Sequence, residues 1–187
     1  LPVFQHPDPG QEITRLLASV AAQPERCHVI GAYALGKAQR VIRLIREAGH
    51  DAPIFLHGAQ EKLCAYYASQ GVELGNLQKA LDRDKAAFPG HIVIAPPSAL
   101  RDRWSRRLPD PVICQASGWM TIKQRAKQSG VELPLVISDH ADWNELTDTI
   151  TATGADTIWV THGREDALVH WCRSRGLQAE PLYMQGR

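Results

Sequence analysis

The amino-acid sequence predicts an α/β fold with a largely parallel sheet, arranged as in Rossmann-like domains. Short apolar runs alternate along the chain with helical patterns of about 10–15 residues, which is typical of βαβ units. The 187 residues are 44% hydrophobic and 22% charged, as in folded globular domains. No internal repeat or low-complexity tract interrupts the alternation. The length therefore fits one ordinary domain, or one compact domain and part of another.

The first half of the chain begins with a predicted helix at residues 9–22, because apolar residues recur there on one helical face. A second amphipathic run is followed by Gly49, a residue that often ends helices. The other elements predicted in this half are strands at 27–31 and 52–58 and helices at 36–49 and 59–71.

The second half repeats the alternation after a looser polar stretch at residues 73–90. Strands are predicted at 91–96, 111–117, 133–138, 156–163 and 177–183. Helices are predicted at 121–130, 142–154 and 164–176, with a helical turn near 98–104. The most polar and basic stretch of this half lies near residues 120–133, where a seam between two parts of the chain is expected.

Charge and hydropathy narrow the function classes. The formal net charge of +1 argues against a strongly basic arm that binds nucleic acid, but it is compatible with a local basic groove because net charge averages over faces. No apolar run approaches the roughly 20 residues that cross a bilayer, so no membrane association is expected. The opening residues LPVFQHPDPG lack the pattern of a signal peptide and an initiator Met. We therefore expect a fragment or a processed chain.

The four cysteines are far apart and form no C-x-x-C pair. Cys27 and Cys114 lie in or beside apolar strand runs, where cysteine acts as a small hydrophobic residue. A reducing cytoplasm fits this usage best. The five tryptophans are expected to be core and domain-interface residues rather than a platform on which bases stack.

Two histidines directly follow predicted strands. His140 comes after LPLVIS and His162 after DTIWVT, and functional groups in open α/β sheets gather beyond the carboxyl ends of strands. If these strands are neighbours, about 4.8 Å apart, the two imidazoles can share one site. Asp139 and Asp142 flank the first histidine and could hold its imidazole in one tautomer or add oxygen ligands. Alternatively, both histidines are ordinary loop residues and the aspartates cap the helix that begins near Trp143.

A second candidate is the segment GAYALGKAQR. It lacks both G-x-G-x-x-G and G-x-x-x-x-G-K-[ST], so an ordinary strand-to-helix turn explains it. Lys37, Gln39 and Arg40 nevertheless fall in the first turns of the following helix, where backbone N–H groups face outward and can contact a phosphate. No G-x-S-x-G motif is present, so a serine nucleophile on such a turn is not expected.

Four segments in a fixed order resemble one known family. GAYALGKAQRVIRLI, ASGWM, VISDHADWNEL and IWVTHGRE are similar to motifs of the β-CASP branch of the metallo-β-lactamase-fold nucleases. The resemblance is strongest to the bacterial ligase-associated DNA exonucleases, also described as messenger-RNA 3′-end-processing-like proteins. It implies a Rossmann-like β-CASP domain with its N-terminal linker at residues 1–125. Residues 126–187 would be the C-terminal βαβαβ part of a metallo-β-lactamase domain.

The resemblance also implies a site with two divalent metal ions, zinc in first place and manganese as the alternative. His162 is similar to the last metal ligand of the family, and His140 to the histidine near the scissile phosphate that assists the leaving group. Asp142 resembles the acid that supports this site. Candidate substrate-binding residues are Ser117 and Gly118, similar to a loop near the substrate channel, and Lys37.

Most family ligands belong to an H-x-H-x-D-H motif, which this sequence lacks. Two metals about 3.5–4 Å apart acidify a bridging water and clamp the phosphate oxygens, and such a centre needs more ligands than this chain contains. We therefore expect the chain alone to be inactive and residues outside this sequence to complete the site.

The predicted function is part of a metal-dependent DNA exonuclease in ligase-associated DNA repair. Its expected partners are DNA and an ATP-dependent DNA ligase, and its expected location is the cytoplasm. The alternatives are a nuclease that processes RNA 3′ ends, a non-catalytic module that binds nucleic acid or protein, or, by analogy of fold only, a small α/β enzyme acting on nucleotides or sugars.

Overall fold

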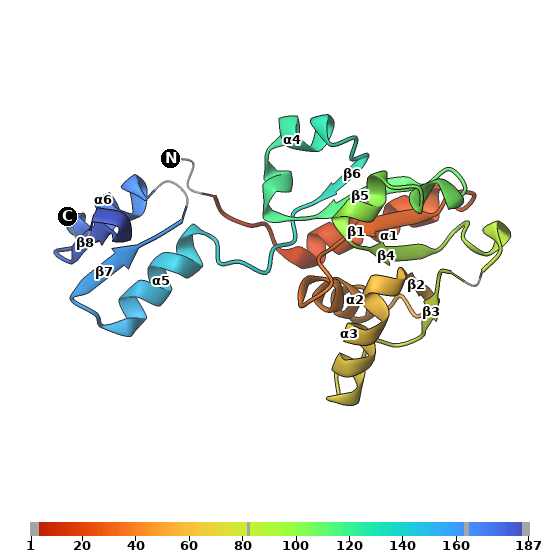
Figure 1. The fold of residues 1–187 in the computed structure, drawn as a ribbon, viewed down its shortest axis with the longest axis horizontal. Helices are drawn as coiled ribbons and strands as arrows, with labels where there is room; N and C mark the ends of the chain where they lie inside the picture. The colour runs from red at the N-terminus through yellow and green to blue at the C-terminus, as the bar shows by residue number, and fades with distance from the viewer. Residues whose placement is uncertain (1–3, 82, 163–164, 185–187) are drawn as a thin grey trace. The chain divides into compact units, whose positions relative to one another are not determined.

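The computed structural model describes residues 4–81, 83–162 and 165–184 (Figure 1). The chain forms two compact units. The first, which we call the core unit, is His6–His140. The second, the C-terminal unit, is Ala141–Arg187 together with Leu1–Gln5.

The core unit is built on a six-stranded sheet in the order β3-β2-β4-β1-β5-β6, and every described strand pair is parallel. The strands are β1 (His28–Gly31), β2 (Ile54–Leu56), β3 (Leu77–Lys79), β4 (Ile92–Ala95), β5 (Val112–Ala116) and β6 (Leu133–Leu135). The register of the central strand pairs His28 with Ile92 on one side and with Val112 on the other. The carboxyl ends of β1, β5 and β6 consequently lie side by side at one edge of the sheet.

The two faces of this sheet are covered differently. Helices α1 (Pro9–Ala22), α2 (Lys37–Glu47) and α3 (Gly58–Ser69) contribute apolar side chains to one core, together with Ile30 and Ile92 of the sheet. The opposite face packs against short segments, mainly the 3₁₀ turns η1 (Lys85–Ala87), η2 (Pro97–Arg101) and η3 (Ser105–Arg107). Turn η4 (Gly118–Thr121) and the short helix α4 (Lys123–Gln128) join β5 to β6. The second face therefore has less continuous cover than the first.

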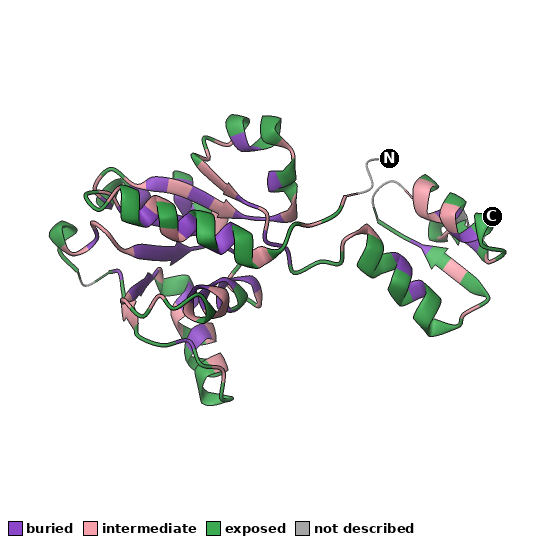
Figure 2. Ribbon diagram, turned by 180° about the vertical axis from the view of Figure 1, so that it is seen from behind, coloured by how far each residue is buried: buried purple, intermediate pink, exposed green. Residues whose placement is uncertain are grey.

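The C-terminal unit contains a two-stranded parallel sheet, β7 (Thr157–Val160) and β8 (Gln178–Pro181). Helices α5 (Trp143–Thr153) and α6 (Asp166–Ser174) and the turn η5 (Leu182–Met184) complete it. Its described core consists of five small or medium side chains, namely Ile150, Val160, Val169, Cys172 and Ala179. Buried residues are accordingly sparser here than along the strands of the core unit (Figure 2).

The predicted α/β class with a largely parallel sheet is confirmed, and the predicted helices and strands are found near their expected positions in the described residues. Strand β3 lies within the stretch at 73–90 for which no strand was predicted. The expected strand at 133–138 ends already at Leu135, because the chain then turns to form the loop that carries His140.

The division between the compact units falls after His140 rather than near the predicted seam. Strand β6 pairs with β5, and Leu135 and Ile137 belong to the main core, so residues up to 140 stay with the core unit. The assignment of residues 1–125 and 126–187 to two family domains stays a prediction.

The four cysteines are buried free thiols, and Cys27 and Cys114 are fully enclosed in apolar clusters, as predicted. Trp104 and Trp171 pack against the cores, whereas Trp119 and Trp159 are 54% and 46% exposed and are therefore not core residues. In the part of the chain that the structure describes, no helix is long and apolar enough to cross a membrane.

Candidate functional site

Polar residues gather at the carboxyl edge of the core-unit sheet. Lys37 begins α2 just beyond β1, Ser117 and Gly118 follow β5, and Asp139 and His140 follow β6. We call these five residues, together with Arg40 and Ser138, the carboxyl-edge cluster. Residues more than one hundred positions apart in sequence meet here because β1, β5 and β6 are adjacent parallel strands.

The loop between β1 and α2 holds Lys37 in place. Gly36, at φ +80°, takes a left-handed conformation that favours glycine just before the helix begins. The buried Gln39 accepts a hydrogen bond from the Gly36 N–H (2.8 Å) and donates one to the Ala34 carbonyl (3.0 Å). Gln39 therefore stabilises the conformation of the loop. Its side chain is buried, which does not support the predicted contact of this residue with a phosphate.

Lys37 and Asp139 form the central ion pair of the cluster. The Lys37 Nζ lies 2.7 Å from the Asp139 Oδ1, and the lysine side chain is only 3% exposed. Burial raises the pKa of the Asp139 carboxyl, but the hydrogen bond and positive charge of Lys37, a backbone amide and His140 outweigh this effect, so that its pKa is lowered. Asp139 is thus a carboxylate at neutral pH, and it compensates a buried ammonium.

His140 rests against the same carboxylate. Its Nδ1 is 3.0 Å from Asp139 Oδ1, and its backbone N–H donates to Ser138 Oγ (3.1 Å). A carboxylate can only accept hydrogen bonds, so the contact favours the tautomer with the proton on Nδ1. The imidazole is 81% exposed, which leaves Nε2 available for proton transfer or for a metal. The predicted role of Asp139 in fixing the imidazole agrees with this geometry.

Ser117 and Gly118 shape the loop after β5. Ser117 donates its N–H to the Leu135 carbonyl (3.1 Å), and its Oγ accepts from the Trp119 N–H (3.3 Å). A β-carbon on Gly118 would lie 2.9 Å from His6 Nε2 and 3.3 Å from Ser138 Oγ. A side chain at this position would therefore have to displace the side chains of His6 and Ser138. Substrate contact by these two residues stays a prediction.

Two further residues tie the helices to the segment after β6. Arg40 donates from its guanidinium to the Ser138 carbonyl (2.5 Å), and the buried Glu12 accepts from the Val136 N–H (2.7 Å). The sequence indicates the importance of Asp139 only through its position beside His140. Its pairing with Lys37 depends on strand order and cannot be found from a local pattern.

The remaining predicted site residues lie in the C-terminal unit. Asp142 is the N-cap of α5: its Oδ1 accepts from the Glu145 N–H, and Glu145 Oε2 accepts from the Asp142 N–H, both at 2.9 Å. Of the two aspartates that were expected to cap this helix in the alternative interpretation, Asp142 does so and Asp139 does not. The catalytic role of Asp142 stays a prediction. His162 follows β7, is exposed, and has φ +69°, a left-handed conformation that is uncommon for histidine. Such conformations cluster at functional sites.

The expectation that neighbouring strands bring His140 and His162 together is wrong. Strand β6 is the edge of the six-stranded sheet, whereas β7 pairs with β8 in a separate sheet. The sequence order of the two strands suggested adjacency, but β7 forms its parallel pair with the strand that follows it. A site shared by the two imidazoles stays a prediction, as does the assignment of His162 as a metal ligand.

The imidazoles of His140 and His162 are of a type that can bind the predicted metal, zinc. Exposed imidazoles are good ligands for zinc. The carboxylate behind the His140 Nδ1 is the type of partner that orients metal-bound or catalytic histidines. One or two imidazoles do not make a complete two-metal site.

Comparison with known proteins adds one informative similarity. No family model matches the chain. A segment of 151 residues, 81% of this chain, is 27% identical to a protein named "Probable DNA ligase" from Opitutus terrae. The chain spans only 14% of the length of that relative. Among solved structures, a protein of unknown function from Enterococcus faecalis V583 matches 83% of this chain and 42% of its own, with 12% identity and a TM-score of 0.39, which is too low to indicate a shared fold.

Proposed function

We propose that this chain is part of a metal-dependent nuclease that hydrolyses phosphodiester bonds in DNA. The observation that carries the proposal is the contact between His140 and Asp139, with Asp139 held by the buried ammonium of Lys37. This arrangement presents an oriented and exposed imidazole at the carboxyl edge of a parallel sheet, where α/β proteins place their functional groups.

The choice of DNA is supported by the similarity to the "Probable DNA ligase" segment and by the resemblance of four motifs to ligase-associated exonucleases. We propose exonuclease action in ligase-associated DNA repair as the finer assignment. In the proposed protein the other metal ligands come from residues outside this chain.

His140 would act as the acid in this reaction. In the protonated imidazole both nitrogens carry a proton: Nδ1–H donates to Asp139, and Nε2–H is transferred to the leaving oxygen as the P–O bond breaks. Asp139 stabilises the imidazolium, and Lys37 keeps Asp139 ionised. His162 would hold one of two metal ions, which when bound activate the attacking water and neutralise the phosphate.

The decisive experiment uses the complete protein that contains this chain. His140→Ala should retain the metals and bind DNA normally, while turnover falls by about 10²–10⁴-fold, the usual contribution of general acid catalysis. The loss should shrink for a nitrophenyl phosphodiester, because its leaving group needs no proton. Asp139→Asn should give a milder defect with the same dependence on the leaving group.

His162→Ala should reduce metal content as well as activity, because it removes a metal ligand. His170→Ala is the matched control, since His170 is also an exposed histidine of the C-terminal unit. Full metal occupancy in the His162 variant would refute the ligand assignment. Equal losses on good and poor leaving groups in the His140 variant would refute the proton transfer. The 187-residue chain alone should show no metal-dependent cleavage.

A further inference from the structure

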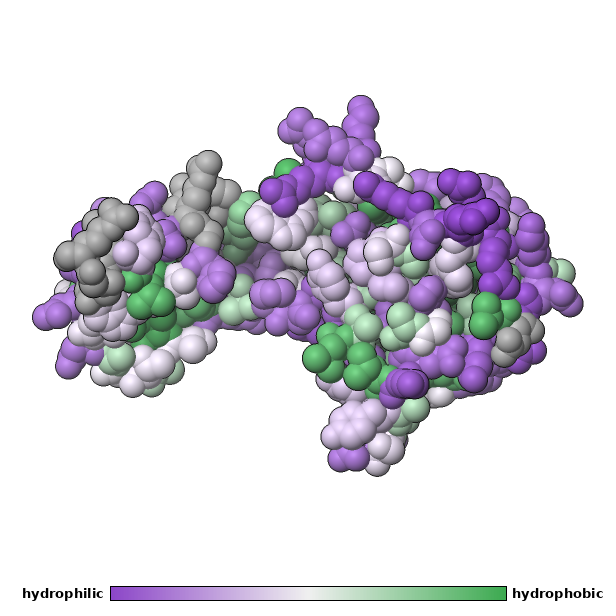
Figure 3. All heavy atoms as spheres, viewed as in Figure 1, coloured by the Kyte–Doolittle hydropathy of each residue, from purple (hydrophilic) through white to green (hydrophobic). Residues whose placement is uncertain are grey.

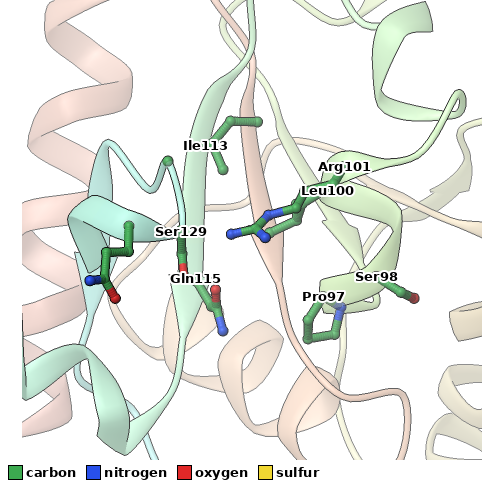
Figure 4. A pocket seen from close by; sticks show the side chains of 9 residues that line it. Pro97, Ser98, Leu100, Arg101, Ile113, Gln115 and Ser129 are labelled. Atoms are coloured by element: carbon green, nitrogen blue, oxygen red, sulfur yellow. The ribbon is translucent and has the colours of Figure 1, made fainter. Parts of the chain in front are cut away.

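A trough lies over β5 on the less covered face of the core-unit sheet, outside the carboxyl-edge cluster. Its floor is formed by Ile113 and Gln115 of β5, and it has a cavity volume of about 680 Å³ (Figure 4). One wall is η2, with Pro97, Ser98, Leu100 and Arg101, and the other is the end of α4 and the following turn, with Gln128, Ser129 and Gly130. None of these residues belongs to the cluster.

The trough exists because the connections around β5 are short. After β4 the chain forms two 3₁₀ turns, and α4 is only six residues long. Val112, Cys114 and Ala116 are buried, whereas Ile113 and Gln115, which alternate with them, are only half-buried. A polar floor residue in a parallel sheet is unusual, since both faces of such sheets are normally covered by apolar packing.

The segments on both sides of the trough are basic. Residues 97–130 contain seven exposed cations, Arg101, Arg103, Arg106, Arg107, Lys123, Arg125 and Lys127, and two acidic residues, Asp102 and Asp110. Asp110 already pairs with Arg26. The whole chain, in contrast, has 21 cations and 20 anions. Strongly hydrophilic side chains accordingly gather over α4 and over the neighbouring part of the core unit (Figure 3).

Several of these cations have no anionic partner among the described residues. Within the part of the chain that the structure describes, no ion pair is formed by Arg101, Arg106, Lys123 or Lys127. The guanidinium of Arg101 extends over the floor of the trough between its two walls (Figure 4). The lining of the trough therefore combines the guanidinium of Arg101 with amide, hydroxyl and apolar groups, and further exposed cations lie on the segments that form its walls.

We propose that this trough binds a segment of single-stranded nucleic acid. Phosphates would lie along the cations of η2 and α4, the segments that form the two walls, which do not converge on one point. Bases would enter the trough, where Ile113 and Leu100 offer apolar contact and Gln115 and Gln128 offer hydrogen bonds to base edges. The volume is in the range of about 300–1,000 Å³ typical of small-ligand pockets, which suits one or two nucleotides but not a duplex.

The choice of a nucleic acid over another polyanion rests in part on the proposed function. The trough shares no residue with the carboxyl-edge cluster, so it would hold a part of the strand other than the scissile phosphate. Binding can be measured without any cleavage, and a failure of the trough is therefore distinguishable from a failure of the nuclease proposal.

The test is fluorescence anisotropy of a labelled 12-nucleotide single strand with the 187-residue chain in EDTA. The double variant Arg101→Glu/Lys127→Glu should weaken binding about tenfold or more, and losing two phosphate contacts should lower the salt slope by about 1.4. Gln115→Phe fills the floor without changing the charge, and it should weaken binding severalfold. Lys62→Glu/Lys79→Glu is the control, because it makes the same charge change on exposed residues of α3 and β3. It should change affinity less than about twofold.

Melting temperatures of all variants establish that each is folded. The proposal is overturned if the unaltered chain does not bind the oligonucleotide, or if the control weakens binding as much as the trough variant. It is also overturned if Gln115→Phe has no effect in a folded protein. Equal binding of a duplex, or equal competition by polyglutamate, would likewise contradict it, since the first excludes entry into the trough and the second indicates an acidic protein partner.

Discussion

The two units of this protein use the same element, a pair of parallel strands joined through a helix, with very different amounts of support. In the core unit, β1 lies between two parallel neighbours and all four of its residues are buried. In the C-terminal unit, β7 has one described partner, and only Val160 of its four residues is buried. Parallel sheets are stable when both faces are covered. A strand can therefore be predicted correctly from the sequence although the prediction does not indicate how much the surrounding packing stabilises it.

The same contrast applies to two aspartates three residues apart. Asp139, in the core unit, compensates a buried ammonium and contacts an imidazole. Asp142, in the C-terminal unit, caps a helix. The first aspartate connects distant segments electrostatically, whereas the helix cap made by the second is formed with Glu145, three residues further on.

The largest expected difference between the units concerns their strands. Ile30→Ala in β1, where the side chain is fully buried, should lower the free energy required to open the core unit by about 2–5 kcal/mol. Ile158→Ala in β7, where the side chain is half-buried, should cost only about 1 kcal/mol, because less apolar area is lost. Hydrogen exchange of the β1 and β7 amides measures the opening of each unit separately. Similar losses at the two positions would show that the C-terminal unit is packed as firmly as the core unit.

A smaller effect is expected from Asp139→Asn, which leaves the ammonium of Lys37 buried without its carboxylate. The cost should be about 1–3 kcal/mol, below that of a fully enclosed pair because Asp139 is 32% exposed. Exchange of core-unit amides should report the loss, and that of β7 and β8 should not. The double variant Lys37→Met/Asp139→Asn is the control, and it should recover most of the stability because no uncompensated charge remains.

The stability of the core unit should also depend on acid pH through Asp139. The pKa of this carboxyl is lowered in the folded state, so its contribution is fully present above the unfolded value of about 4 and is lost as the pH falls through the folded pKa. Urea denaturation between about pH 2 and 6 should show a smaller acid loss in Asp139→Asn than in the unaltered protein. If Asp139→Asn loses as much stability at acid pH as the unaltered protein, the partners of Asp139 do not stabilise its carboxylate in the folded state.

The smallest effect is expected from Asp142→Ala, which removes the N-cap of α5. The cost should be about 1 kcal/mol and should be confined to the C-terminal unit. Asp148→Ala, at an exposed position within the same helix, is the control and should have almost no effect. Hydrogen exchange of the first turn of α5 distinguishes the two variants. A loss that also reaches β1 would show that the two units open together.

Local pattern was sufficient for most of the elements and for some of the site. Apolar periodicity predicted α1 and α2, and continuous apolar runs predicted β1 and β4, because burial sets those patterns residue by residue. The cap at Asp142 follows the same rule, since the two residues of the capping box, Asp142 and Glu145, lie three positions apart. Strand β3 was missed because it is short, partly exposed, and contains Gln78 and Lys79, which are not typical of buried strands.

The sequence by itself determined the α/β class, the order of the elements apart from β3, and the histidines that follow strands. Only the tertiary structure decided that β1, β5 and β6 are adjacent and that β7 belongs to another sheet. That arrangement brings Lys37 to Asp139 and leaves β5 open as the floor of a basic trough. The physical reason is that the hydrogen bonds between strands join backbone groups that lie far apart in the sequence. A local run of residues therefore does not determine which strands pair.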